Sequence, residues 1–174
     1  MFRYIMFSMN ITLPDGSIRE LPKGSTGLDL AQSIGPGLAK AALAVVVNGI
    51  QNDLSDPIND DSEVSIITIN SDEGLEIMRH TLTAQVLARA VQNIYPQTKL
   101  AIGPTIKDGF YYDFESTETI TNDHLEKIES EMKKIISSNS SITKKLHTKE
   151  EAVNIFNKKG ESYKEIIIEE AEQE

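Results

Sequence analysis

The 174-residue sequence predicts an α+β fold made of two consecutive parts. Strand-like alternation and one helical pattern follow each other closely up to about residue 69, and a second set of such patterns starts after Gly74. The stretch Asn70 to Gly74 between them is polar and turn-prone, which is typical of a domain boundary. An apolar content of 39% is enough for a buried core in one domain or two small ones.

The first part has the pattern of a small sheet curled around one helix. Asp15-Gly16 between two alternating runs predicts a β-hairpin, because Gly takes the positive φ of the turn without steric cost. Thr26 and Asp29 have the spacing of a capping box and predict a helix that stops at Gly35-Pro36-Gly37. The segment 54–58 is irregular. Strands are predicted at 10–13, 18–21, 44–48 and 63–69.

The second part opens with a long amphipathic helix from Leu75 to the residue before Pro96. Further helices are predicted at 122–137 and at 149–159, the latter stopped by Gly160. The five Glu residues after Lys164, with no basic residue among them, indicate a solvated acidic tail at 169–174. Strands are predicted at 99–102, 109–114, 142–147 and 163–168.

Composition narrows the classes of function. The sequence has no cysteine, which excludes disulfides and thiolate metal sites and leads us to expect the cytoplasm. The longest apolar run, near 41–47, is far shorter than the roughly 20 residues of a membrane-spanning helix, so no membrane partner is expected. Met1 to Phe7 is too short for a signal sequence and is interpreted as an upstream start or a disordered tail. A net charge of −10 argues against a free-standing nucleic-acid binder, since such binding depends on Lys and Arg.

One long block resembles a known domain. It contains Leu13-Pro14-Asp15-Gly16-Ser17 and Leu21-Pro22-Lys23-Gly24, and it continues from Leu28 to Ala42 as Leu-Asp-Leu-Ala-Gln-Ser-Ile-Gly-Pro-Gly-Leu-Ala-Lys-Ala-Ala. This block resembles the TGS domain that opens bacterial threonyl-tRNA synthetases, which implies a β-grasp domain at residues 9–70. TGS domains also occur in (p)ppGpp synthetases and in some GTPases, so the block predicts the fold better than the function.

A second block distinguishes between these hosts. Ile102-Gly103-Pro104 followed by Asp108-Gly109-Phe110-Tyr111-Tyr112-Asp113-Phe114 resembles the start of the threonyl-tRNA synthetase editing domain, as does the preceding helix from Leu75 to Val91. Gly160-Glu161-Ser162-Tyr163-Lys164 matches a later motif of that domain at a fitting distance. The resemblance implies the N-terminal half of an editing domain at residues 74–168.

The resemblance implies that the parent enzyme attaches threonine to tRNA(Thr) with ATP and hydrolyses mischarged seryl-tRNA. The family has a zinc ion in a class II catalytic core, and its editing domain uses a later Cys and His; these 174 residues contain none of those parts. We therefore expect no cofactor in this chain, with ATP and zinc implied only for the intact parent, a homodimer. The chain alone is expected to be inactive and to bind nucleic acid weakly or not at all, with tRNA(Thr) reached through the parent.

The resemblance also indicates three candidate catalytic residues, His80, Gln85 and Lys164. In the family, the first editing helix carries two His four residues apart on one face. Here one residue is inserted and Gln85 replaces the second His. An unbroken α-helix would place His80 and Gln85 about 140° apart, and only a π-bulge, which absorbs one residue, could restore their alignment.

Lys164 matches a lysine of the family's editing pocket, and Tyr111 to Asp113 are expected to form a half-buried strand at the pocket wall. The alternative for His80 is a leftover imidazole on a helix, and the alternative for Lys164 is a solvated strand lysine. Two other hypotheses for the whole chain stay open. One is a stand-alone TGS-containing regulatory or tRNA-associated adaptor without catalytic activity. The other is a regulatory protein of the nucleotide-synthetase type, which Gly109 to Asp113 disfavours.

Overall fold

The computed structural model describes residues 7–171, which fall into two compact units. The N-terminal unit is Met1–Met78 and the C-terminal unit is Arg79–Glu174. The predicted disordered start, Met1 to Phe7, lies outside the described residues except for Phe7, and so do the last three residues of the predicted acidic tail. Within the described range, no helix combines the length and apolar character needed to cross a membrane.

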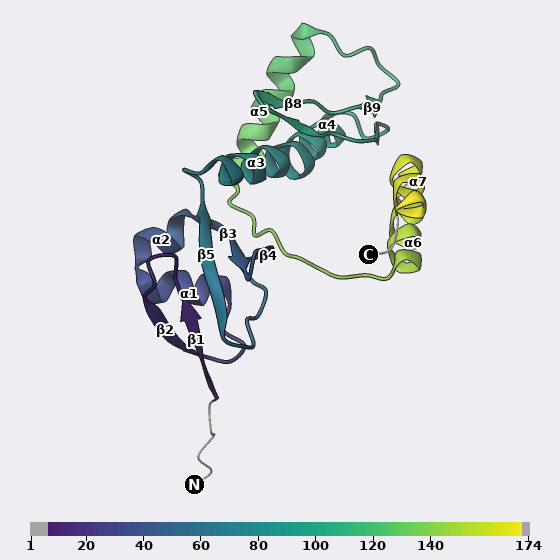
Figure 1. The fold of residues 1–174 in the computed structure, drawn as a ribbon. Helices are drawn as coiled ribbons and strands as arrows, with labels where there is room; N and C mark the ends of the chain where they lie inside the picture. The colour runs from purple at the N-terminus through teal and green to yellow at the C-terminus, as the bar shows by residue number, and fades with distance from the viewer. Residues whose placement is uncertain (1–6, 172–174) are drawn as a thin grey trace. The chain divides into compact units, whose positions relative to one another are not determined.

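The N-terminal unit is a five-stranded mixed sheet with two helices (Figure 1). The strand order is β2-β1-β5-β3-β4, in which β1 and β5 are parallel and the other neighbours are antiparallel. This arrangement confirms the predicted α+β class and the hairpin around Asp15-Gly16. The elements are β1 (Ser8–Thr12), β2 (Ile18–Pro22), α1 (Gly27–Ile34), α2 (Pro36–Ala41), β3 (Ala42–Val47), β4 (Ile50–Asp53) and β5 (Ser62–Thr68).

Helix α1 begins where the sequence predicts. Thr26 and Asp29 form a capping box, in which each side chain accepts a hydrogen bond from the other residue's backbone N–H. Gly27 lets the helix approach β3 closely, because a Cβ atom there would lie 2.6 Å from Cγ1 of Val45. Leu30 is fully buried against the sheet as a result. The core of this unit contains Met9, Ile11, Leu30, Val45, Ile58 and Val64.

Two elements of this unit differ from the prediction. Gly35-Pro36-Gly37 ends α1 but also starts α2, because Pro at the first helical position is already in a helical φ range. Strand β4 was not predicted, although Asn48-Gly49 carries its signal. Both residues have positive φ, 50° and 85°, and they turn β3 back into an antiparallel partner.

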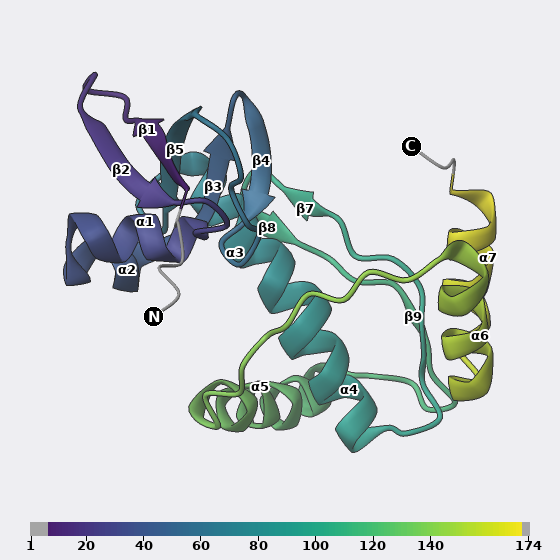
Figure 2. The same ribbon diagram turned by 90° about the horizontal axis from the view of Figure 1, so that it is seen from below.

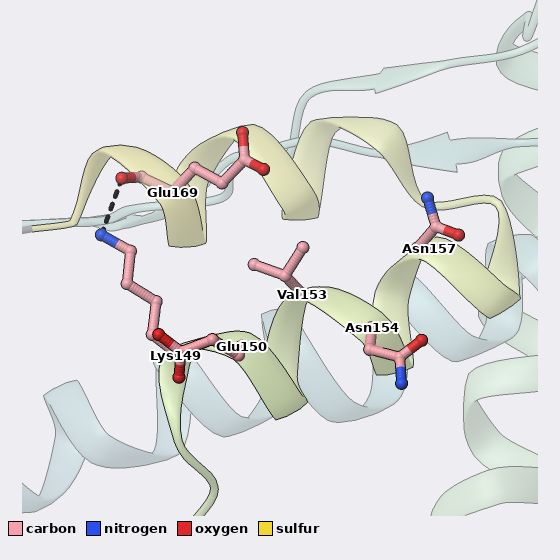
Figure 3. Close-up of a pocket in the computed structure, with 6 residues that line it drawn as sticks. All are labelled: Lys149, Glu150, Val153, Asn154, Asn157 and Glu169. Carbon is pink, nitrogen blue, oxygen red and sulfur yellow. Dashed lines mark hydrogen bonds between the residues drawn. The ribbon is translucent and has the colours of Figure 1, made fainter.

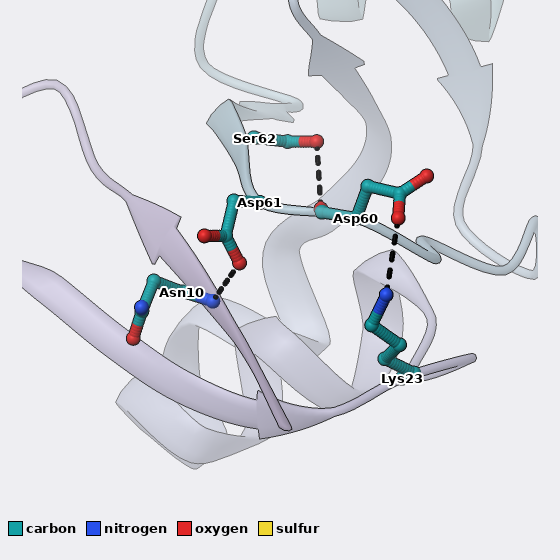
Figure 4. A network of polar contacts seen from close by, with 5 residues as sticks. All are labelled: Asn10, Lys23, Asp60, Asp61 and Ser62. Atoms are coloured by element: carbon teal, nitrogen blue, oxygen red, sulfur yellow. Dashed lines mark hydrogen bonds and ion pairs between the residues drawn. The ribbon is translucent and has the colours of Figure 1, made fainter. Parts of the chain in front are cut away.

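Polar contacts fix the loop before β5 (Figure 4). The backbone N–H of Asn10 donates to the Asp61 carboxylate at 2.8 Å, and Lys23 forms an ion pair with Asp60 at 3.1 Å. Ser62 Oγ donates to the Asp60 carbonyl at 2.9 Å. These contacts hold the start of β5 beside β1, where their parallel pairing begins at Ile11 and Ser62.

The helix that follows β5 begins earlier than predicted. Helix α3 (Asp72–Thr81) includes Asp72 to Gly74, so only Asn70 and Ser71 of the predicted polar boundary lie outside helix or strand. Ser71 Oγ accepts the Gly74 N–H at 3.0 Å and so satisfies one donor of the first turn. The predicted continuous helix to Pro96 consists of α3, the π-helix η1 (Leu82–Leu87) and α4 (Ala88–Ile94).

The strands of the C-terminal unit are shorter than predicted. Gly109 to Phe114 is not one strand, because it divides between a tight hairpin, β7–β8, and the ladder of β6 with β9. The remaining helices match predicted positions at α5 and α6, and the latter ends at Gly160, which has φ 72°. The elements are β6 (Lys99–Leu100), β7 (Thr105–Ile106), β8 (Gly109–Phe110), β9 (Phe114–Glu115), α5 (Asn122–Ser137), α6 (Lys149–Lys159) and α7 (Ser162–Glu170).

Two predicted strands are wrong. Residues 142–147 are exposed and have no regular structure, since no strand edge pairs with them. The predicted strand 163–168 is helix α7, which packs against α6 (Figure 2). The β-branched run Ile166 to Ile168 suggested a strand, but the neighbouring helix supplies the packing. Glu169 and Glu170 belong to α7, so the predicted acidic tail starts inside this helix.

Candidate functional site

The helix that carries His80 and Gln85 is interrupted by the π-helix Leu82–Leu87. The backbone N–H of Ala88 donates to the carbonyl of Thr83, five residues earlier, as a π-turn requires. Thr83 is fully buried, and its hydroxyl donates to the Arg79 carbonyl at 2.7 Å. The 140° separation calculated for an unbroken α-helix therefore does not apply to this segment, because η1 accommodates an additional residue in its turn.

His80 and Gln85 do not share a groove. His80 lies exposed near the end of α3, and Gln85 lies exposed in η1 beside a groove that His80 does not line. Within residues 7–171, no hydrogen bond, ion pair or ring contact joins His80 or Gln85 to Lys164. The structure thus separates the three predicted residues into two places, η1 with its flanks and α7.

Of the three predicted residues, Lys164 has the side chain with the most contacts described in the structure. It lies on α7, is half-buried, and donates from Nζ to the carbonyl of Ala101 at 2.7 Å. Its ammonium lies 5.6 Å from the centre of the Tyr112 ring, within range of a cation–π interaction. The alternative of a solvated strand lysine is therefore wrong in both respects, because the residue is helical and its ammonium is bound.

The two partners of Lys164, Ala101 and Tyr112, lie on backbone segments that are hydrogen-bonded to each other. Ala101 N–H donates to the Asp113 carbonyl at 3.0 Å, and Asp113 N–H donates to the Ile102 carbonyl at 2.8 Å. These bonds extend the β6–β9 ladder by a few residues. Tyr111 to Asp113 is not a regular strand, contrary to the prediction, but Tyr112 is half-buried as expected.

Gly103 connects the lysine to the π-helix. A Cβ atom at this position would overlap the Tyr112 ring and would lie 2.8 Å from the Thr83 methyl group and 2.9 Å from the Tyr111 carbonyl. Only glycine leaves room for all three neighbours. Gly103 thus lies between Thr83 of the π-helix and Tyr112, whose ring is beside the Lys164 ammonium. We call Thr83, Gly103, Tyr112 and Lys164 the lysine cluster.

Glu161 holds the start of α7 and was not singled out from the sequence. Its side chain is 8% exposed, and its carboxylate accepts hydrogen bonds from the Gln92 amide and, at 3.1 Å, from the Leu100 N–H. Lys164 N–H donates to the Glu161 carbonyl at 3.0 Å, so the two residues share the first turn. A glutamate directly after Gly160 and three residues before a lysine is the signal that could have found it.

Tyr163 forms a further contact of α7. Its hydroxyl donates to the Glu115 carboxylate at 3.0 Å, and this hydrogen bond to a negative group raises the pKa of the Tyr163 phenol. The phenol therefore remains protonated and donating across the neutral range. Glu161, Tyr163 and Lys164 thus bind three successive points of the segment 100–115.

A cavity of about 490 Å³ lies between α6 and α7 (Figure 3). Lys149 Nζ donates to the carbonyls of Glu169 and Ala171 at 2.7 and 2.9 Å, and so satisfies acceptors at the end of α7. None of the three predicted catalytic residues lines this cavity, which is bordered by Lys149, Glu150, Val153, Asn154, Asn157 and Glu169. We assign it to the packing of the two helices.

The lysine cluster has the chemistry of a site that holds a polar ligand. One N–H of the Lys164 ammonium is used by Ala101, and two remain for a hydroxyl, an ester oxygen or a water. The residues do not suit a metal ion: between residues 7 and 171, no group of three or more His, Asp or Glu side chains is arranged to hold one.

The chain is similar to known proteins over most of its length. The TGS domain model matches residues 9–68. The chain is 45% identical over 161 residues to a threonine–tRNA ligase of Rhizobium etli (strain CIAT 652), covering 92% of this chain and 24% of the relative. It is 47% identical over 156 residues to that of Bacillus velezensis and 49% identical over 156 residues to threonine–tRNA ligase 1 of Bacillus subtilis (strain 168).

Each of these Bacillus matches covers 90% of this chain and 24% of the relative, so the chain spans about a quarter of the length of its relatives. The matched quarter is the N-terminal part of the ligases. Residues 9–68 thus match the TGS domain family, and nine-tenths of the chain is similar to the N-terminal part of threonine–tRNA ligases.

Proposed function

We propose that this chain is the N-terminal part of a threonine–tRNA ligase, with a TGS domain and the first half of an editing domain for mischarged seryl-tRNA. The supporting observation is the similarity to these ligases along both units, at 45% to 49% identity. A stand-alone TGS adaptor would need similarity only in the first unit. The match instead covers 90% to 92% of the chain and so extends well into the second unit.

The proposed chemistry is hydrolysis of the ester that joins serine to the tRNA end. Lys164 orients the substrate or a water through its two remaining N–H donors. His80 accepts a proton from the water that attacks the acyl carbon and passes it to the tRNA ribose oxygen, which leaves as the ester bond to serine breaks. Gln85 can donate and accept hydrogen bonds but cannot take a proton, so it contributes positioning only. The chain alone catalyses neither aminoacylation nor seryl-tRNA hydrolysis in this proposal.

The remaining properties are proposed for the intact ligase. It joins threonine to tRNA(Thr) with ATP in a class II core, holds zinc in that core, forms a homodimer and works in the cytoplasm.

A chimera tests the proposal. This chain replaces the corresponding N-terminal part of the Bacillus subtilis ligase, and threonylation of tRNA(Thr) and release of serine from seryl-tRNA are measured separately. We expect threonylation to persist, because its core comes from the host, and serine release to fall by about 10²- to 10⁴-fold, the usual cost of losing one acid-base group. A folded chimera without threonylation would contradict the ligase assignment.

Two repairs separate the causes of the lost editing. Gln85→His alone restores a second imidazole with the π-helix intact, while Gln85→His with Leu82 deleted also removes the additional residue. If the π-helix already compensates for the insertion, the first repair is sufficient. Serine release by the unrepaired chimera at the rate of the native ligase would show that Gln85 causes no defect.

A further inference from the structure

A second concave site lies on the C-terminal unit, apart from the lysine cluster. It is a groove of about 390 Å³ between η1, the start of α4, the last turn of α5 and residues 139–143. Aliphatic side chains line it together with residues that carry amide, hydroxyl and guanidinium groups. The polar lining residues of this Arg89 groove are Gln85, Arg89, Asn139, Ser140, Ser141 and Thr143.

The charge of the Arg89 groove is opposite to that of the chain. The chain has 27 Asp and Glu against 17 Lys and Arg, yet no Asp or Glu lines this groove. Arg89 is exposed, four residues after Gln85 on the same helical stretch, and no hydrogen bond or ion pair to another described residue occupies its guanidinium. The groove therefore offers a positive group with hydrogen-bond donors around it.

The sequence that borders the groove continues this pattern. Residues 133–149 contain five Lys and no Asp or Glu, in a chain whose net charge is −10. Lys133 and Lys134 are paired with Glu129 and Glu131, so they add little. Lys145 follows the groove by two residues and is exposed. Arg89 is thus the basic side chain that lines the groove, and Lys145 follows the lining residues closely in the sequence.

We infer that the Arg89 groove binds the phosphodiester backbone of RNA, as an anchoring contact centred on Arg89, which is not one of the proposed editing residues, although Gln85 borders the same groove. Arginine, serine, threonine, asparagine and glutamine are the side chains that proteins use on phosphate and sugar groups. The groove concentrates these types and excludes carboxylates, which repel phosphate. This inference rests on the proposed function for the choice of RNA as the polyanion.

The contact is local, which keeps binding weak. A phosphate contact releases about one counterion, so each one contributes a slope near −0.9 to the plot of log affinity against log salt concentration. One arginine with a neighbouring lysine corresponds to one or two such contacts. The expected affinity of the whole chain is accordingly low, and the groove supplies most of its salt dependence.

Fluorescence anisotropy with a labelled tRNA(Thr) transcript tests this inference on the 174-residue chain. Arg89→Gln removes the charge but keeps a good helix former and an amide, so the helix should remain folded. We expect the affinity to fall about tenfold, as for loss of one charge-assisted hydrogen bond, and the salt slope to decrease by about 1. Ser141→Asp, in a segment without regular structure, should weaken binding at least as much.

Lys158→Gln is the matched control, because it removes one exposed positive charge from a helix of the same unit, away from the groove. Equal effects of Arg89→Gln and Lys158→Gln would overturn the inference, since only net charge would then matter. No detectable binding by the unaltered chain at low salt would overturn it as well. If millimolar AMP or inorganic phosphate displaces the RNA, and this displacement requires Arg89, the ligand of the groove is a small phosphate compound and the inference of RNA binding is overturned.

The measurement is independent of the proposed editing reaction. Binding needs no serine release, so loss of the editing function leaves an Arg89-dependent affinity unchanged. Conversely, if Arg89→Gln leaves tRNA binding unaltered while the repaired chimera releases serine, the groove inference fails and the editing proposal stands.

Discussion

The two units of this protein are stabilised in different ways. Ten of the buried apolar residues in the described part of the chain lie in the N-terminal unit, and four, Ala88, Ala90, Val91 and Ile128, lie in the C-terminal unit. The N-terminal unit has a closed aliphatic core around Leu30 and Val45. In the C-terminal unit, helices α6 and α7 contain no fully buried apolar residue.

Specific polar contacts take the place of a large core in the C-terminal unit. The carboxylate of Glu161 receives two donors, and Lys164 and Tyr163 add two more bonds to the segment 100–115. Buried area is non-directional, whereas these bonds depend on geometry. The N-terminal unit should therefore tolerate substitutions on its surface and lose stability when a core residue is truncated. The stability of the C-terminal unit should depend on single polar groups.

The largest effect is expected for Leu30→Ala. Leu30 is fully buried in the core of the N-terminal unit, so its truncation should lower the free energy of unfolding of that unit by about 2–5 kcal/mol. Hydrogen exchange resolved by segment measures the change, with protection lost in β1, β3 and β5 and retained in α4 and α5. Four of the five tyrosines, at 95, 111, 112 and 163, lie in the C-terminal unit, so tyrosine fluorescence reports mainly on its folding.

Leu28→Ala is the control for this experiment. Leu28 lies on the same helix but is 38% exposed, so the same chemical change should cost much less. A similar loss from both variants would mean that helix propensity, and not core packing, stabilises α1. Loss of protection in α4 and α5 with Leu30→Ala would mean that the units unfold together.

Glu161→Ala should produce the next largest effect, in the other unit. It leaves the Gln92 amide and the Leu100 N–H without their acceptor in a buried position, at a cost of about 1–3 kcal/mol. Urea unfolding followed by tyrosine fluorescence should show this loss. Glu161→Gln keeps one acceptor oxygen and should fall between the wild type and the alanine variant.

Glu169→Ala is the matched control, since Glu169 is exposed on the same helix and only its backbone carbonyl is bonded to Lys149. If Glu161→Ala is no more harmful than Glu169→Ala, the buried carboxylate does not hold α7. In that case, a buried apolar core in one unit and polar contacts in the other would not explain how the two units are stabilised.

The smallest effect concerns Asp29 and the pH dependence of the N-terminal unit. The Thr26 N–H and hydroxyl bond the Asp29 carboxylate, and they lower its pKa below the ordinary value of 3.8. A lowered folded-state pKa stabilises the unit above the unfolded-state pKa, and this contribution is lost as the pH falls through the folded-state pKa. At pH 7, Asp29→Asn should therefore be less stable by about 0.3–1 kcal/mol.

Thermal unfolding of wild type and Asp29→Asn between pH 7 and pH 3 measures this contribution as a difference, in which the other carboxylates cancel. The difference should shrink towards zero below pH 3.8. A difference that stays constant over this range would show that the charge of Asp29 does not contribute to the cap.

The features that could be predicted from the sequence alone are those with a local cause. The Asp15-Gly16 turn, the Thr26–Asp29 capping box and the stop of α6 at Gly160 each depend on a few adjacent residues, and all occur in the structure. The motifs from Leu13 to Ala42 and from Ile102 to Phe114 indicated the relatives that the comparisons found. The α+β fold class was also predicted from these local helix and strand patterns.

Features that depend on a distant neighbour could not be predicted from local sequence patterns and were found in the folded structure. The run Ile166 to Ile168 suits a strand or a helix, and it became helix α7 because α6, not a strand edge, lies beside it. The additional residue near Gln85 became part of a π-helix, since Thr83 is held in a buried position beside Gly103. Lys164 obtained its bond to Ala101 from 63 residues away, and no local pattern specifies a contact whose partner is chosen by packing.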